Sequence, residues 1–222
     1  MPAMDEHTYR ATHREYVGAI WEIEEEGIPV IQARIAEWLG VSRASVSEMM
    51  RKLQAEGLVT SDPIALTDEG RRLAEVIVRR HRLAERFLSE VLGLSWDKVH
   101  PEAEVWESVI SDDVEKAMWA AMENPTTCPH GNPIPGAGYK PPPMHPLSEM
   151  DDSPAIVERI SEELELDDEL MGFLDRAGLR PGEEVAVVGR SPQGTLTIKV
   201  AGGDSFGVGD FVAERVFVAA AR

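Results

Sequence analysis

The stretch 32–59, "QARIAEWLGVSRASVSEMMRKLQAEGLV", decides the fold of the first part of the chain. A short helix over 31–39 is expected to end at a turn at Gly40, after which Ser42 can cap a second helix. This order predicts a helix-turn-helix. The second helix buries one stripe of apolar side chains at helical spacing: Val46, Met49, Met50 and Leu53.

The flanking segments extend this motif to a winged helix-turn-helix. On the N-terminal side, 9–27 carries apolar residues at helical spacing and stops at Gly27. On the C-terminal side, two short extended pieces flank Asp62-Pro63, and Thr67 can cap the helix that follows. We therefore predict a DNA-binding domain over 1–74.

Two amphipathic helices are expected next, over 68–91 and 100–123, and they indicate a helical domain over 75–137. The second helix has more apolar surface than a small domain needs, which indicates a homodimer. The segment 128–146 holds 7 of the 15 prolines and excludes helix. It predicts an ordered loop that leads into a Pro-rich linker over 138–153.

The last part of the chain predicts a small barrel. The segment 156–179 resembles a helix broken near Asp167. Alternating β-branched runs with tight turns follow and indicate about five strands. We expect a small β-barrel domain over 154–222, so the fold class is mainly α with a small β part.

Composition limits the classes of function. The chain carries 22 Lys and Arg against 40 Asp and Glu, a formal charge of −18, so its surface repels polyanions unless a local basic patch exists. No apolar run approaches the length of a membrane span, and we expect a cytoplasmic protein without a membrane partner. The single Cys128 cannot form an internal disulfide or, by itself, a thiolate zinc site.

The stretch 78–115 concentrates side chains that can hold a metal. His81 and Glu85 share a helix face at i and i+4, and His100 lies on the next helix, which the turn at Gly93 returns beside the first. Nitrogen and oxygen donors together suit a borderline-to-hard divalent ion. The alternative interpretation is a solvated acidic face with structural histidines.

These segments together resemble the diphtheria toxin repressor family of metal-dependent transcription regulators, of the manganese- or iron-responsive type. The resemblance rests on "YVGAIWEIEEEG", "ARIAEWLGVSRASVSEMM", "HRLAERFL" followed by "VHPEAEVWE", and "GNPIP", and it covers nearly the whole chain. It implies two divalent ions per chain, with Mn(II) favoured and Fe(II) as the alternative, since Glu15 and Glu104 are hard donors.

The resemblance implies that 75–137 form a metal-binding and dimerisation domain and that 154–222 form an SH3-like (FeoA-like) domain. It also assigns sites residue by residue. The family's ancillary metal site matches His81, Glu85, His100, Glu162 and Glu165, and its primary site matches Glu15, Glu104, Glu107 and Ser108. Because Ser108 stands where the family has histidine, the primary site lacks a nitrogen; His13, His7, Glu102 or water are the open replacements. The family's anion site matches Arg82 and Asn132, with Cys128 where serine is common.

The partner that the resemblance implies is a double-stranded DNA operator, and the implied role is repression of metal-uptake genes. In a helix-turn-helix the second helix enters the major groove. Two other interpretations stay open: a metallohydrolase using His81, Glu85 and His100, and a constitutive DNA-binding protein that metal does not control. The expected DNA contacts are Ser42, Arg43, Ala44, Ser45, Glu48, Arg51 and Lys52.

Overall fold

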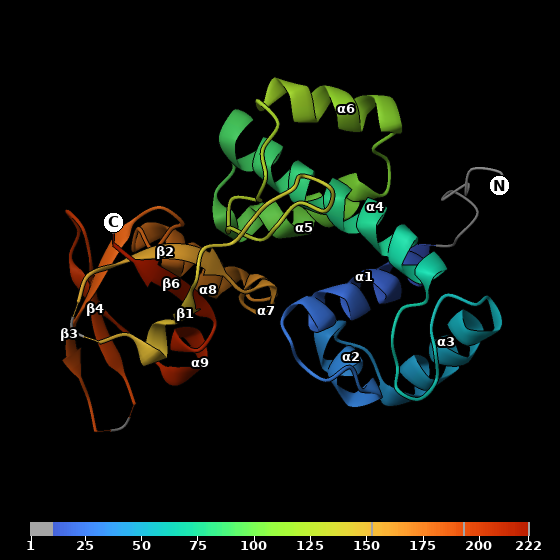
Figure 1. Cartoon of the computed structure of the whole chain (residues 1–222), viewed down its shortest axis with the longest axis horizontal. Helices are drawn as coiled ribbons and strands as arrows, with labels where there is room; N and C mark the ends of the chain where they lie inside the picture. The colour runs from blue at the N-terminus through green and yellow to red at the C-terminus, as the bar shows by residue number, and fades with distance from the viewer. Residues whose placement is uncertain (1–10, 152, 193, 222) are drawn as a thin grey trace.

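The computed structural model describes residues 11–151, 153–192 and 194–221. Three buried apolar clusters mark three bodies, which Figure 1 shows as the blue helices α1 to α3, the green helices α4 to α6, and the orange-to-red sheet. Helix α4 packs on both α1 and α5, and α5 packs on α8 of the third body. The middle body therefore contacts the other two.

The first body is the expected winged helix-turn-helix. It contains α1 (Ala11–Glu25), α2 (Gln32–Trp38) and α3 (Arg43–Ala55), followed by a wing closed by a bridge between Val59 and Leu66. Ser42 caps α3 and Thr67 caps α4: their hydroxyls accept from the backbone N–H groups of Ser45 and Gly70, both at 3.1 Å. Both predicted caps are confirmed.

The second body consists of α4 (Asp68–Arg86), which continues into a π-helical turn (Phe87–Val91), then α5 (Trp96–Glu107) and α6 (Asp112–Ala121). The expected single helix over 100–123 is wrong. The chain breaks after Glu107, and the hydroxyl of Ser111 accepts from the backbone N–H of Val114 at 3.4 Å to start α6. Three acidic residues in the first turn of α6 favour this second start through the helix dipole.

The third body is one antiparallel sheet with short helices, in the strand order β1-β6-β2-β3-β4-β5. Its apolar core includes Leu147 and Met150 from the end of the proline-rich segment, so the expected linker packs onto the sheet. The elements are β1 (His145–Pro146), a 3-10 turn (Leu147–Glu149), β2 (Ala155–Ile160), α7 (Glu162–Glu165), α8 (Asp168–Arg176), β3 (Glu184–Arg190), β4 (Leu196–Val200), β5 (Ser205–Val208), α9 (Asp210–Ala213) and β6 (Val216–Ala220).

The expected helix over 156–179 is wrong at its start. Its first residues form strand β2, which lies between β6 and β3 and buries the β-branched Val157 and Ile160. β-branched side chains fit a packed strand better than a helix. The expected break near Asp167 is confirmed, because its carboxylate accepts from the backbone N–H of Leu170 at 3.0 Å and starts α8.

Candidate metal centre

A buried cluster of nitrogen and oxygen donors lies where α4, α5 and the third body meet. His81 Nε2 lies 3.3 Å from Glu85 Oε1 and 3.2 Å from His100 Nδ1. Glu85 is fully buried and His81 is 4% exposed. The helical spacing of His81 and Glu85 and the return of α5 beside α4 bring these three side chains together, as the sequence predicted.

Two glutamates of α7 complete the group. His100 Nδ1 lies 3.7 Å from Glu165 Oε2, and Glu162 offers an oxygen within 4.8 Å of donors on His81, Glu85 and His100. Ser161 starts α7 by accepting from the backbone N–H of Glu163, and this turn directs the two carboxylates inward. The structure therefore brings together all five residues expected at the ancillary site.

Two further donors in this region were missed by the sequence analysis. Cys128 and His130 join Glu85 and Glu165 in a second group whose ligand atoms all lie within 4.8 Å of one another. His130 is fully buried, with its Nδ1 2.6 Å from Glu165 Oε2 and its ring edge-on to Trp96. The alternating Cys-Pro-His spacing in an otherwise apolar loop was the available signal.

Several donor atoms in the two groups lack hydrogen bonds within the described residues. They are Glu85 Oε1 and Oε2, Glu162 Oε1, Glu165 Oε2 and both ring nitrogens of His130. Their closest polar neighbours are one another, as at His130 Nδ1 and Glu165 Oε2, and a cation among them would satisfy these otherwise costly buried atoms. The donor set of imidazole, carboxylate and one thiol therefore fits a divalent transition metal.

Without an ion, two of the buried groups, His81 and Glu165, hold protons. Burial would lower the pKa of His81, but Glu85 and Glu107 raise it well above its ordinary range. Burial and the neighbouring carboxylates of Glu85 and Glu162 raise the pKa of Glu165 well above its ordinary value. Burial lowers the pKa of His130, so its imidazole is already neutral and able to donate a lone pair. A bound cation would replace the protons of His81 and Glu165.

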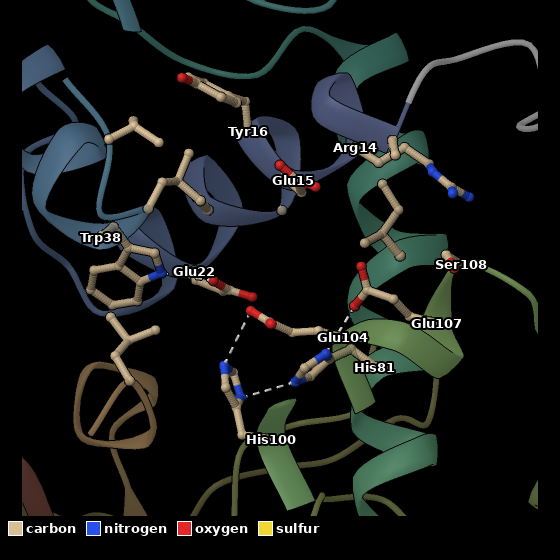
Figure 2. A pocket seen from close by; sticks show the side chains of 17 residues that line it. Arg14, Glu15, Tyr16, Glu22, Trp38, His81, His100, Glu104, Glu107 and Ser108 are labelled. Atoms are coloured by element: carbon tan, nitrogen blue, oxygen red, sulfur yellow. Dashed lines mark hydrogen bonds and ion pairs between the residues drawn. The ribbon is translucent and has the colours of Figure 1, made fainter. Parts of the chain in front are cut away.

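A second group of carboxylates lines a cavity of about 360 Å³ between α1 and α5. Glu15 comes from α1, while Glu104, Glu107 and Ser108 come from α5 and its end, as Figure 2 shows. His81 Nδ1 lies 2.8 Å from Glu107 Oε2, and the same ring faces the buried cluster through Nε2. His81 therefore links the two groups.

The structure separates the proposed replacements for the missing histidine. Ser108 lines the cavity, and its hydroxyl donates to the carbonyl of Val105 at 2.8 Å. His13 faces the end of α3, with its Nδ1 3.7 Å from Glu56 Oε2, and Glu102 is exposed outside the cavity lining. His7 lies outside the described residues. The nitrogen nearest Glu107 among the cavity residues is that of His81, which we had assigned to the ancillary site alone.

The residues expected at the anion site are engaged by protein groups. Arg82 is fully buried, and its Nη2 donates to Glu25 Oε2 at 2.5 Å and to Glu162 Oε2 at 2.9 Å. Asn132 Nδ2 donates to Glu165 Oε1 at 2.7 Å. An anion site at Arg82 and Asn132 stays a prediction.

Comparison with known proteins gives the context for this geometry. Residues 10–64 match the N-terminal DNA-binding domain of iron-dependent repressors, and 67–136 match their metal-binding and dimerisation domain. Residues 145–220 match the FeoA domain. The iron-dependent repressor IdeR of Mycobacterium tuberculosis is 39% identical over 206 residues, which cover 86% of this chain and 89% of that protein. The chain belongs to the diphtheria toxin repressor family.

Other members support this assignment. The diphtheria toxin repressor of Corynebacterium efficiens is 37% identical over 203 residues, which cover 84% of this chain and 86% of that protein. A solved structure of a manganese-dependent transcriptional repressor in complex with manganese is 34% identical, with a TM-score of 0.84 over 94% of this chain and all of that one. The chain is thus a metal-dependent transcription regulator. This family membership favours the regulator interpretation over that of a metallohydrolase.

The DNA-binding domain of this family member presents one polar face on α3. Ser42, Arg43, Ala44 and Ser45 are exposed at its start. Glu48, Arg51 and Lys52 are exposed further along, and Lys52 Nζ lies 2.7 Å from Glu48 Oε1. All seven expected contact residues therefore lie on accessible surface. Within the described ranges, no helix combines the length and the apolar character that a bilayer crossing requires.

Proposed function

We propose that this chain is a homodimeric repressor of metal-uptake genes, activated in the cytoplasm by Mn(II), with Fe(II) as the alternative ion. The observation that carries the proposal is the pair of donor groups joined by His81, one buried between α4, α5 and α7 and the other open between α1 and α5. One group lies against the third body and the other against the DNA-binding domain. Ions there can act on the position of α1.

Two ions per chain are proposed, one in each group. In the buried group His81, Glu85, His100, Glu162 and Glu165 would hold the ion, with Cys128 and His130 as further donors. In the open group Glu15, Glu104 and Glu107 would hold the other, and His81, whose Nε2 lone pair would serve the buried ion, would donate through Nδ1 to Glu107. Carboxylate oxygens favour Mn(II), whereas the thiol of Cys128 adds affinity for Fe(II) and Zn(II).

Charge explains how an ion could change DNA binding. Glu15 on α1 faces the same cavity as Glu104 and Glu107 on α5, and without a cation these carboxylates repel one another. A divalent ion reverses the repulsion and draws α1 toward α5. Because α1 packs in the core that also holds α3, the ion fixes the DNA-reading helix relative to the dimerisation helices.

The dimer would place two such helices on one operator. Exposed valines lie on α5, in the turn that follows it and near the start of α6, in the segment that matches a dimerisation domain: Val105 at 63%, Val109 at 75% and Val114 at 47% exposure. Burial of these side chains against a second copy removes apolar surface from water. Dimerisation also doubles the contacts to DNA. These are needed because the residues before Glu75 include 8 basic and 13 acidic side chains, whose net negative charge repels DNA.

The test is a selection of DNA from a random pool by the purified protein, with Mn(II) present and again with a chelator. We expect one family of palindromic sequences to be enriched only with Mn(II), and metal analysis to find about two ions per chain. The same sequences recovered with chelator would select the constitutive interpretation. Failure to enrich any sequence under either condition would contradict sequence-specific binding.

Ser108→His is expected to tighten Mn(II) binding by about tenfold or more, because it adds a nitrogen donor to a carboxylate cavity. The Mn(II) concentration for half-maximal DNA binding should fall accordingly. Calorimetric titration measures the first effect and fluorescence anisotropy the second. Thr12→His, which adds an imidazole to the exposed face of α1 outside the cavity, is the matched control. An unchanged affinity in Ser108→His would show that His81 already fills that coordination position.

Side chains on α3 are expected to read DNA in different ways. Arg43→Ala and Glu48→Ala should each reduce the discrimination between the preferred base and other bases by about 1 to 3 kcal/mol, the value of a good base contact. Lys52→Ala should weaken binding to all DNA sequences alike and reduce the dependence of DNA affinity on salt concentration, as loss of a phosphate contact does. Binding to a set of single-base operator variants measures both effects. Base preference that survives Glu48→Ala would mean that Glu48 serves only its ion pair with Lys52.

A further inference from the structure

A buried ion pair joins the chain just after α1 to the third body. Arg159 on β2 donates through Nη1 and Nη2 to the two carboxylate oxygens of Glu26, at 3.0 and 2.9 Å. The two side chains are 9% and 5% exposed. Glu26 Oε1 also accepts from the backbone N–H of Glu162 at 3.2 Å. A bidentate pair held this way fixes orientation as well as distance.

Local features of the sheet aim Arg159 at this contact. The register of β2 against β6 shifts between Val157 and Arg159, the mark of a β-bulge, and a bulge redirects the side chain that follows it. The guanidinium of Arg159 lies over the ring of Phe217, 4.3 Å from its centroid. Its Nη1 also donates to Asn132 Oδ1 at 3.3 Å. Arg159 is thus preorganised to hold Glu26.

The same corner of the third body carries donors of the buried metal group. Glu162 holds Glu26 through its backbone N–H and offers its carboxylate to the metal group. The loop that carries Cys128 and His130 is tied to the corner: Ile160 N–H donates to the carbonyl of His130 at 2.8 Å. An ion that draws these groups together therefore also fixes the residues that hold Glu26.

A parallel contact supports the same connection. The guanidinium of Arg82 bridges Glu25, the last residue of α1, and Glu162. Two neighbouring glutamates at the end of α1, Glu25 and Glu26, are therefore both linked to Glu162: Glu25 through Arg82, and Glu26 through the backbone N–H of Glu162. The link from Glu26 uses the backbone N–H of Glu162 and leaves its carboxylate free for the metal group, whereas Arg82 binds that carboxylate directly.

We infer that the Glu26–Arg159 pair is a latch through which an ion in the buried group sets the position of the DNA-binding domain. The inference rests on the proposed function. Glu26 and Arg159 are positioning residues: they touch neither the ion nor DNA. The coupling between Mn(II) and DNA should therefore depend on the latch, while the number of ions bound should not.

The experiment compares DNA affinity of the full-length protein at saturating Mn(II) and in chelator, with the DNA selected above. The variants are Glu26→Gln, which removes the charge, and Arg159→Lys, which keeps the charge but cannot form the two parallel hydrogen bonds. Glu69→Gln is the matched control, because it removes an exposed ion pair with Arg72 within one helix. Thermal unfolding and metal analysis accompany each protein.

In both latch variants we expect the ratio of the two affinities to fall by about tenfold, within the usual range of allosteric coupling, with Mn(II) per chain unchanged. Glu69→Gln should match the unaltered protein. If Arg159→Lys keeps the same ratio of DNA affinities as the unaltered protein, the latch is overturned. Should Glu26→Gln fail to fold, the result with Arg159→Lys alone decides. Loss of bound Mn(II) would also contradict the latch, by making the pair a support of the metal group. A ratio of one in the unaltered protein would instead refute the proposed function.

Discussion

Glu85→Gln is expected to abolish the response of DNA binding to Mn(II) and to remove about one ion per chain. Glu85 is shared by the two buried donor groups, so its loss weakens both His81–His100–Glu162 and Cys128–His130–Glu165. Burial would raise the pKa of Glu85, but His81 and His130 hold it well below its ordinary value, so the side chain is a carboxylate ready to bind a cation. Metal analysis and anisotropy measure the two effects.

Glu90→Gln is the control for this prediction. Glu90 lies in the π-helical turn after α4, where its exposed carboxylate pairs with Arg86, and its substitution removes the same charge outside the donor groups. We expect it to bind Mn(II) and DNA as the unaltered protein does, since exposed ion pairs contribute little. Full metal content in Glu85→Gln would contradict the assignment of the buried groups as a metal centre.

Gly131→Ala is expected to lower the free energy of unfolding by about 3 kcal/mol or more, because it disrupts the packing of the third body on the helical body. Gly131 has a φ of +88°, and a Cβ there would overlap the carbonyl oxygen of Glu158 and lie 2.9 Å from Arg159 Cα. Both obstacles are backbone and cannot rotate away. The loop that carries Cys128 and His130 would therefore leave β2, and Mn(II) affinity should fall together with the unfolding temperature.

Gly138→Ala separates the two causes of this effect. Gly138 also has a positive φ, +71°, but a Cβ there meets nothing within 4 Å. It carries only the backbone cost, about 1 kcal/mol. Differential scanning calorimetry measures both variants. Equal destabilisation would show that close packing of the metal loop on β2 contributes nothing.

Much of the fold and part of the metal centre could be predicted from the sequence, because the relevant signals are local. Ser42 and Thr67 are cap residues directly before apolar periodic segments, and His81 with Glu85 share a helix face by spacing alone. The break after Glu107 was missed because the helical pattern continues through it, and β2 was missed because its residues precede a true helical segment.

The parts that could not be predicted depend on contacts between distant segments. Cys128 and His130 become donors only because the proline-rich loop returns to the gap between Glu85 and Glu165. His81 faces the open group through Nδ1 because α5 places Glu107 beside it. Likewise, the pairing of Glu26 with Arg159 spans 133 residues and follows from a bulge in β2. The spacing of residues along the sequence does not predict contacts between segments so far apart.

The most direct test of the account is whether Mn(II) and DNA strengthen each other's binding equally. Mn(II) affinity of the full-length protein is measured by calorimetry with and without a saturating amount of the selected DNA, and DNA affinity is measured with and without Mn(II). If metal positions the DNA-binding domain, both affinities rise and the free energies of coupling agree, as linkage requires. Mn(II) affinity that is unchanged by DNA, together with DNA affinity that is unchanged by chelation, would contradict metal control of this protein.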